Sequence, residues 1–133
     1  MTLKDLIVDS NVLVDYFGKT ANHELVSKYF ETDYNLWINP MIIAETYNFL
    51  ANRLGLSFAL TFNEWLIENP ALTIIELAEE DMVRITKQKN LLQDVNLSLT
   101  DWAIILHTQD LGIKCVTTDN LLVSFAYGMA FVP

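Results

Sequence analysis

Four short apolar runs constrain the fold of this chain more than any other feature of its sequence. They are residues 6–8 (LIV), 36–39 (LWIN), 72–77 (LTIIEL) and 113–118 (IKCVTT), and each has the length and composition of a β-strand. The runs are apolar throughout rather than at every second residue, which is typical of strands that are buried on both faces. Such strands occur in parallel sheets that helices cover on both sides.

Helical patterns occupy the segments between and after these runs. They are residues 22–31, 40–54, 57–69, 78–90, 98–112 and 120–128. The second segment has the clearest ends, because Asn39 suits an N-cap, Pro40 suits the first helical position and Gly55 suits the end of a helix. Strands and helices therefore alternate. The sequence predicts an α/β fold, a three-layer sandwich with a central, mostly parallel sheet flanked by helices.

The chain has the size and composition of one domain. It has 133 residues, of which 52% are apolar, and it contains no repeat or linker, so we expect a single domain over residues 1–133. The N-terminus lacks a signal-peptide pattern, and no apolar run reaches the roughly 18 residues that a membrane span needs. The single Cys115 cannot form an internal disulfide and suits a reducing compartment. We therefore expect a cytoplasmic protein without a membrane segment.

A carboxylate interrupts the first apolar stretch. Asp9 stands in IVDSNVL, directly after the first predicted strand, although aspartate is a poor strand former and is rarely buried without a partner. Asp119 follows the last predicted strand in the same way. In a parallel sheet both residues lie at the edge formed by the carboxyl ends of the strands, which is where such folds bind their ligands.

Two further acids fall on apolar sides of predicted helices. Glu45 has Ile42 and Phe49 among its helical neighbours, and Asp101 precedes the apolar segment 102–106 (WAIIL). A buried carboxylate without a counter-charge is costly or becomes protonated. No Arg or Lys stands near these four acids, so we expect a divalent cation to balance them. Mg²⁺ and Mn²⁺ prefer such oxygen ligands.

Each of the four acids also has a purely structural interpretation. Asp101 can complete a capping box with Ser98, and Asp119 can be the N-cap of the helix that follows it. Asp9 can be a turn residue at the end of its strand. Glu45 has no capping role, but a different phase of its helix would change the side on which it lies. These alternatives stay open at the level of the sequence.

The order of these motifs resembles that of the PIN-domain ribonucleases, especially the toxin component of VapBC-type toxin-antitoxin pairs. The motifs are IVDSNVLVDYF around Asp9, IIAETYNFL around Glu45, LTDWAIIL around Asp101 and TTDNLL around Asp119. The likeness extends over nearly the whole chain. It implies a PIN-like fold and an acidic quartet, formed by the four acids, that binds Mg²⁺ or Mn²⁺. It also implies that Thr117 is the hydroxyl residue beside the quartet.

The resemblance further implies a metal-dependent endoribonuclease that hydrolyses RNA phosphodiester bonds. In this hypothesis the metal lowers the pKa of a bound water, Asp101 or Asp9 orients that water, and Thr117 positions water or phosphate. The resemblance also implies a small antitoxin protein whose basic segment enters the acidic pocket. Apolar side chains of residues 22–31 and 40–54 are candidates for its docking groove, and internal core is the alternative role for them. Homodimers are common in the resembled family.

Charge alone does not indicate where RNA would bind. The chain has 17 acidic and 8 basic side chains, for a formal charge of -9, which argues against a surface that grips phosphate backbones nonspecifically. The basic residues are scattered apart from a small run at 84–89 (RITKQK), which suits a solvated helix face. Trp102, at a position where the family pattern has a small residue, suits a role in the core.

Other classes fit the motifs less well. A haloacid-dehalogenase-type phosphatase needs a second Asp two residues after the first, where this chain has Asn11. A phospho-receiver domain needs an acceptor Asp after the third strand, which TIIELAEED does not convincingly supply. His23 and His107 do not form a ligand pair, so we interpret both as packing or surface residues and do not expect zinc. A non-catalytic PIN-like protein-binding module is the remaining alternative.

Overall fold

The computed structural model describes residues 3–31 and 33–133. Its strands are β1 (Lys4–Val8), β2 (Tyr34–Ile38), β3 (Leu72–Ile74), β4 (Cys115–Val116) and β5 (Ala130–Phe131). Its α-helices are α1 (Ser10–Phe17), α2 (His23–Ser27), α3 (Pro40–Phe49), α4 (Leu56–Glu68), α5 (Glu79–Leu91), α6 (Leu99–Leu111) and α7 (Asn120–Phe125). A 3-10 turn (Lys28–Phe30) follows α2, and a π-helical turn (Leu50–Leu54) follows α3.

The five strands form one sheet in the order β3-β2-β1-β4-β5. β1 lies at the centre, where Ile7 pairs with Trp37 of β2 on one side and with Cys115 of β4 on the other. The chain first adds β2 and β3 on one side of β1 and then returns to add β4 and β5 on the opposite side. The strand order therefore reverses beside β1. At such a reversal the connecting segments separate and leave a crevice at the carboxyl ends of the strands.

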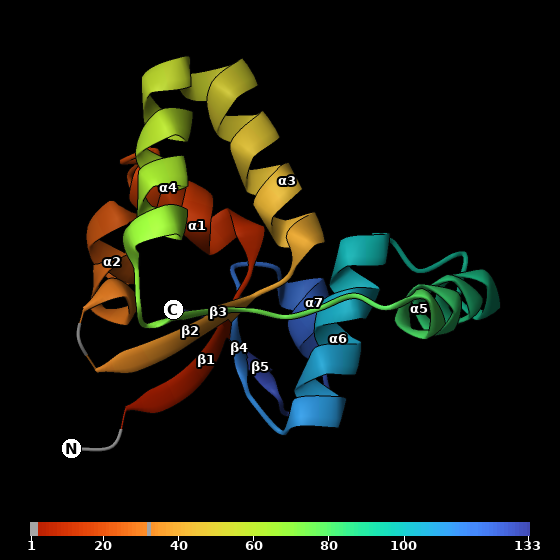
Figure 1. Cartoon of the computed structure of the whole chain (residues 1–133). Helices are drawn as coiled ribbons and strands as arrows, with labels where there is room; N and C mark the ends of the chain where they lie inside the picture. Colours follow the sequence, from red (N-terminus) through yellow and green to blue (C-terminus); the bar gives the residue numbers. More distant parts are fainter. Residues whose placement is uncertain (1–2, 32) are drawn as a thin grey trace.

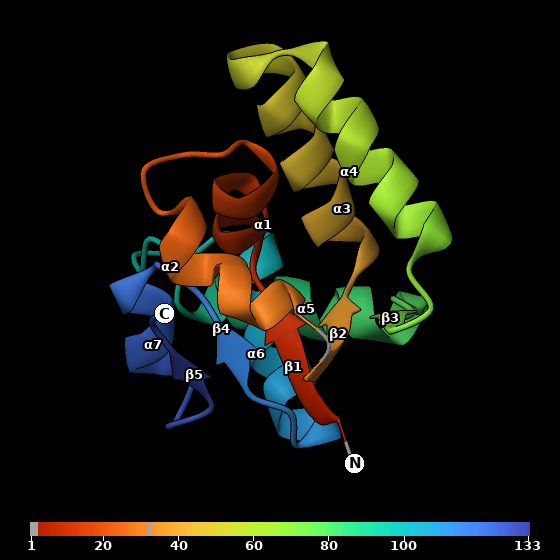
Figure 2. The same cartoon turned by 90° about the vertical axis from the view of Figure 1, so that its left-hand side faces the viewer.

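Helices cover both faces of the sheet (Figure 1, Figure 2). Helices α1 to α4 pack together on one face, and α5 to α7 pack together on the other. Right-handed crossovers explain this division, because they place helices on opposite faces when the sheet is extended in opposite directions. The predicted three-layer α/β sandwich is confirmed, and every strand pair in it is parallel.

Several elements end differently from the sequence-based prediction. The third strand stops at Ile74 rather than at residue 77, and β5 was not predicted because two residues are too few to show a period. The predicted helix 22–31 divides into α2 and the 3-10 turn. The predicted helix 40–54 is regular only as far as Phe49, and its last residues form the π-helical turn before Gly55. At Gly55 φ is 131°, a backbone conformation that favours glycine, so the chain changes direction there as predicted.

Helix α1 has no counterpart among the helices predicted from the sequence. It begins at Ser10, directly after Asp9, and buries Val12, Leu13 and Phe17. These side chains continue the apolar run of β1, so hydropathy does not mark the change from strand to helix. The short junction makes Asp9 both the residue after a strand and the N-cap of a helix.

The core lies between the sheet and the two helix layers. It includes Ile7 and Val8 of β1 and, in the layer of α6, Trp102, which is only 4% exposed. The interpretation of Trp102 as a core residue is therefore confirmed. Cys115 is a free, buried thiol. None of the helices in the described part of the chain combines the length and the apolar character that a membrane crossing requires.

Candidate active site

The ends of three neighbouring strands meet at the carboxyl edge of the sheet. Asp9 follows β1 and Asn39 follows β2, while Thr117 follows β4. The backbone N–H of Asp9 donates to the carbonyl oxygen of Val116 at 3.1 Å, which continues the ladder between β1 and β4 up to this edge. Because the strand order reverses between β1 and β4, Asp9 and Thr117 lie where a ligand crevice is expected.

Asp9 is 2% exposed, and both of its carboxylate oxygens accept hydrogen bonds. Oδ1 accepts from the backbone N–H of Ser10 at 2.7 Å, which caps α1. Oδ2 accepts from the hydroxyl of Thr117 at 2.7 Å and from Nδ2 of Asn11 at 3.1 Å. All of these donors are neutral. The only ion pair among the described residues, between Arg84 and Asp110, does not involve this carboxylate.

The hydroxyl of Thr117 is fully engaged within the protein. The side chain is completely buried, and Oγ1 donates to Asp9. The same oxygen accepts from the backbone N–H of Asp119 at 3.0 Å and from Nδ2 of Asn11 at 3.3 Å. Thr117 therefore positions Asp9, whereas the resemblance implied a contact with water or phosphate.

Glu45 reaches the site from α3. The hydroxyl of Ser10 donates to Oε1 of Glu45 at 3.1 Å and lies 3.4 Å from Oδ1 of Asp9, so Ser10 connects the two carboxylates. Glu45 is exposed, and the buried side of α3 carries Ile42 and Thr46 instead. The expectation that Glu45 lies on the buried apolar side of its helix is therefore wrong. Its carboxylate nevertheless lies beside the buried Asp9.

Asp101 and Asp119 each cap a helix. Oδ2 of Asp101 accepts from the backbone N–H of Ser98 at 2.8 Å, and the backbone N–H of Asp101 donates to Oγ of Ser98 at 3.1 Å. This is the capping box of α6. Oδ1 of Asp119 accepts from the backbone N–H groups of Leu121 and Leu122 at 3.0 and 3.4 Å. Both structural interpretations are confirmed. Each carboxylate still has one oxygen with no hydrogen bond to any described residue, so capping does not exclude a second role.

The charges of these carboxylates act on one another. Burial raises the pKa of Asp9 from 3.8 to about 6. The hydrogen bond from Thr117 lowers this pKa, while the negative charges of Asp101 and Glu45 raise it. Burial also raises the pKa of Asp101, and the charges of Asp119 and Glu45 raise it further. Acidic groups that lie close enough to perturb each other in this way are common at functional sites.

This donor set suits a hard divalent cation in charge and in atom type. Carboxylate oxygens are the ligands that Mg²⁺ and Mn²⁺ prefer, and a cation would relieve the repulsion that raises the pKa values. Within residues 3–31 and 33–133, however, no three His, Cys, Asp or Glu side chains are already grouped closely enough to hold an ion. The four acids therefore fit such an ion by their chemistry, but they do not form a closed coordination sphere.

Two polar residues of the site were not candidates in the sequence. Ser10 connects Asp9 with Glu45, and Asn11 donates to Asp9 while its Oδ1 accepts from the backbone N–H of Thr118 at 3.0 Å. The feature of the sequence that could have identified Ser10 and Asn11 is their position directly after Asp9. Polar side chains in the first turn of a helix that follows a strand lie beside the ends of the strands. That signal is visible only once α1 is recognised.

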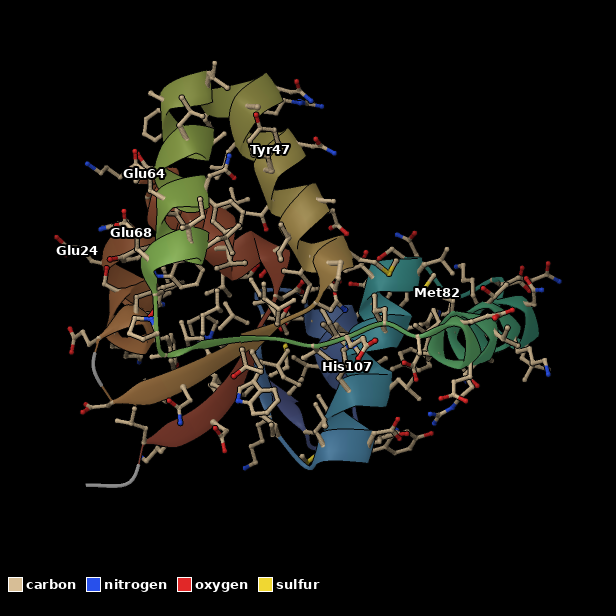
Figure 3. All side chains as sticks on the ribbon, viewed as in Figure 1. Glu24, Tyr47, Glu64, Glu68, Met82 and His107 are labelled. Carbon is tan, nitrogen blue, oxygen red and sulfur yellow. The ribbon has the colours of Figure 1, made fainter. Side chains whose placement is uncertain are left out.

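Asn39 and His107 form a buried polar pair that joins the strand edge to α6. Oδ1 of Asn39 accepts from the backbone N–H of Ile42 at 2.8 Å, which confirms the predicted N-cap of α3. Nδ2 of Asn39 lies 3.1 Å from Nε2 of His107, labelled on α6 in Figure 3. An amide NH₂ only donates, so Nε2 is unprotonated, and burial correspondingly lowers the pKa of His107. Nδ1 of His23 lies 2.8 Å from the carbonyl oxygen of Tyr16. Both histidines pack against other residues, in line with the prediction that each is a packing or surface residue.

Comparison with known proteins identifies a family model and several similar folds. The model described as the PIN domain matches residues 6–126. The VapC20 toxin of Mycobacterium tuberculosis, which cleaves the sarcin-ricin loop, is 11% identical with a TM-score of 0.80, over 90% of this chain and 93% of that chain. FitAcB from Neisseria gonorrhoeae is 14% identical with a TM-score of 0.65, over 95% and 96% of the two chains. PAE2754 from Pyrobaculum aerophilum is 18% identical with a TM-score of 0.64, over 97% and 89%. No curated protein matches the sequence.

Proposed function

This chain belongs to the PIN domain family, and we propose that it is a metal-dependent endoribonuclease that hydrolyses RNA phosphodiester bonds. One observation carries the proposal. Asp9, Glu45, Asp101 and Asp119 lie near the carboxyl edge of the sheet, close enough for their charges to raise the pKa of Asp9 and of Asp101, and no basic side chain among the described residues forms an ion pair with them. A fold that needed these acids only for stability would gain little from carboxylates that repel one another.

The chemistry of the site would require Mg²⁺ or Mn²⁺, held by the four carboxylates. When bound, such an ion lowers the pKa of a coordinated water and neutralises charge on the phosphate in the transition state. Asp9 would be a rigid ligand, because Ser10, Asn11 and Thr117 hold its carboxylate in one orientation. Asp101 is the better candidate to orient the attacking water. Its Oδ2 is held by the capping box, while its Oδ1 has no partner among the described residues.

We also propose that the protein is the toxin of a toxin-antitoxin pair and is cytoplasmic. The support is the PIN domain together with the likeness of the fold to that of VapC20. A basic segment of a small antitoxin protein would be attracted to the acidic cluster. Apolar side chains proposed for its docking are only partly accessible, since Leu25 and Phe49 are 49% and 46% exposed whereas Val26 and Leu50 are buried. A homodimer would be consistent with this proposal.

Calorimetric titration with Mn²⁺, followed by incubation of the loaded protein with total RNA, tests the function. Wild-type protein should bind Mn²⁺ and cleave RNA, and EDTA should stop the cleavage. The double variant Asp9→Asn, Asp101→Asn should do neither while its circular dichroism stays that of a folded protein. Asp94→Asn is the matched control, because Asp94 is an exposed acid outside the site, and it should behave as the wild type does.

Two results would contradict this function. An Asp101→Asn variant that still cleaves RNA would remove the proposed water-orienting group without consequence. Folded wild-type protein that binds no Mn²⁺ would mean that the acids act as caps and surface charges. The alternative, a non-catalytic PIN-like protein-binding module, would then account better for the fold, and capture of a protein partner would become the decisive measurement.

A further inference from the structure

A hollow of about 480 Å³ lies along α6, outside the carboxylate cluster. It is bounded by α5, by α6 and by the chain at and after the end of α7, and Trp102, Phe125 and Tyr127 contribute its aromatic side chains. Figure 1 shows α5 and α6 side by side, with α7 on the opposite flank of α6. The volume is within the range of about 300–1,000 Å³ that is usual for ligand sites.

The hollow adjoins the candidate active site through two helices. Trp102 directly follows Asp101 in the first turn of α6, so one residue faces the acidic cluster and the next lines the hollow. Phe125 lies at the end of α7, the short helix that Asp119 caps, and its ring packs edge-on against Trp102 at 5.9 Å. A strand of nucleic acid bound at the carboxylates could therefore place a neighbouring nucleotide in the hollow.

The charge of the hollow is opposite to that of the whole chain. The chain has 17 acidic and 8 basic side chains, yet the described residues that line the hollow include Arg84 and Lys87 and no acid. Arg84 is held in place by Asp110, at 2.9 and 3.3 Å from its two terminal nitrogens. Lys87 forms no hydrogen bond or ion pair with any described residue, and it is exposed. Two basic residues of the run 84–89, Arg84 and Lys87, therefore line this hollow.

The other side chains of the hollow suit a base. Tyr127 is 84% exposed, which leaves its ring free to stack on a base. Gln88 and Gln109 offer amides that can pair with the edges of a base.

We propose that this hollow is a subsite for single-stranded RNA, in which an unstacked base next to the cleaved phosphodiester is held. This inference rests on the proposed ribonuclease function and assigns the surface that recognises its substrate. Tyr127 stacks on the base, Gln88 and Gln109 contact its edge, and Lys87 contacts the adjoining phosphate. Single-stranded rather than duplex RNA is the ligand because a paired base is not available for insertion.

Fluorescence anisotropy of a labelled single-stranded RNA oligonucleotide, measured in EDTA so that no cleavage occurs, tests the subsite. Tyr127→Asn removes the ring, and because φ at residue 127 is 51°, a conformation that Asn tolerates well, the backbone should not be disturbed. The Kd should rise about tenfold, the effect of one stacked base. The salt dependence of binding should stay unchanged, since no phosphate contact is lost.

Lys87→Gln should give the complementary result. Loss of one phosphate contact should reduce the slope of log K against log salt concentration by about 0.7, the value for single strands. Lys114→Gln is the matched control, because it removes an equal charge from an exposed residue that does not line the hollow. Its affinity and its slope should both equal those of the wild type. The wild type should bind an oligonucleotide with one abasic nucleotide at the occupied position more weakly than the intact oligonucleotide. Tyr127→Asn should bind the two oligonucleotides with equal affinity.

The outcomes separate the subsite from the proposed function. If wild-type protein cleaves RNA with Mn²⁺ but the Tyr127 and Lys87 variants bind RNA as the control does, the subsite is overturned and the ribonuclease stands. If the two variants weaken binding as expected but the wild type does not cleave RNA, the hollow is an RNA site and the ribonuclease fails. Absence of binding by the wild type would overturn the subsite.

Discussion

The Asp9 carboxylate is held at the junction of β1 and α1 by short hydrogen bonds from Ser10 and Thr117, yet it is buried beside other negative charges. The hydrogen bonds favour the ionised form, whereas burial and the neighbouring charges favour the neutral form. Burial is the largest effect, and the pKa is about 6. In the absence of a cation, folding therefore carries a cost above this pH that a bound ion would offset.

We expect this cost to be visible in the pH dependence of stability. Between pH 3.8 and about 6 the folded protein keeps a proton on Asp9 that the unfolded chain has released. The free energy of unfolding therefore falls as pH rises through this window, and above it the loss is about 3 kcal/mol. Asp9→Asn lacks the titrating group. Relative to the wild type, its free energy of unfolding should rise by about 2 kcal/mol between pH 4 and pH 7, the greater part of the full effect.

Urea unfolding in metal-free buffer at several pH values measures this difference. Asp94→Asn, a substitution at an exposed acid, is the control and should follow the wild-type curve. Wild-type and Asp9→Asn curves that stay parallel from pH 4 to pH 7 would show that the folded protein does not raise the pKa of Asp9.

Thr117 should act through Asp9. Thr117→Val keeps the shape of the side chain but removes the hydrogen bond that lowers the pKa of Asp9 and the acceptor for the backbone N–H of Asp119. We expect a loss of about 1–3 kcal/mol in stability. We also expect Mn²⁺ affinity to fall more at pH 6 than at pH 8, because more of Asp9 is protonated at pH 6. Thr117→Ser keeps the hydroxyl and should restore the wild-type pH dependence. Equal loss of affinity at both pH values would mean that Thr117 has only a structural role.

At the scale of elements, α6 combines a structural and a chemical task in its first turn. Ser98 and Asp101 close the capping box, and the next residues along the helix, Trp102 to Ile105, are all buried. The cap therefore orients Asp101 from a helix that packing holds rigidly. Oδ2 of Asp101 accepts from the backbone N–H of Ser98. The other oxygen, Oδ1, forms no hydrogen bond with any described residue, so it is free to bind a ligand.

Ser98→Ala separates these two tasks. It removes the hydroxyl that accepts from the backbone N–H of Asp101, but the backbone N–H of Ser98 still holds the Asp101 carboxylate. Thermal unfolding should show a loss of about 1 kcal/mol, while RNA cleavage per folded molecule should remain. Ser124→Ala, whose hydroxyl donates to the carbonyl oxygen of Asn120 without capping a helix, should change stability less. A cleavage rate that falls as far as in Asp101→Asn would show that the cap and the chemistry cannot be separated.

At the scale of the whole molecule, the acids come from different layers. Asp9 ends the central strand, Glu45 belongs to α3 on one face of the sheet, and Asp101 belongs to α6 on the other. Acids that are exposed on the outside of the molecule, such as Glu64 and Glu68 of α4 in Figure 3, have no part in this cluster. A cation at the sheet edge would therefore connect elements from both helix layers to the sheet.

Metal should consequently stabilise the folded protein as a whole. At a free Mn²⁺ concentration of about 100 times Kd, mass action predicts about 2.7 kcal/mol of added stability. Scanning calorimetry should show a higher Tm for the wild type, and EDTA should reverse the change. The Asp9→Asn, Asp101→Asn double variant should show no increase, and K⁺ at equal ionic strength should not replace Mn²⁺. A similar increase in Tm for the double variant would place the ion elsewhere.

The sequence by itself determined the fold class and the candidate acids. The apolar runs and helical patterns are local, so they indicated the parallel sheet, the N-cap at Asn39 and the residues that follow strands. It did not reveal α1, whose apolar side chains continue those of β1, nor β5, which is too short to show a period. The sequence-based prediction of the side of α3 on which Glu45 lies was wrong, because which side of a helix is buried depends on the elements that pack against it.

Only the tertiary structure decided which distant groups meet. Strand order brought Thr117 to Asp9, and the β1–α1 junction placed Ser10 between Asp9 and Glu45. Packing of α5 beside α6 placed Lys87 next to the hollow that Trp102 lines. These contacts join residues far apart along the chain, and they depend on the summed packing of many side chains. Local patterns in a single sequence do not contain that information.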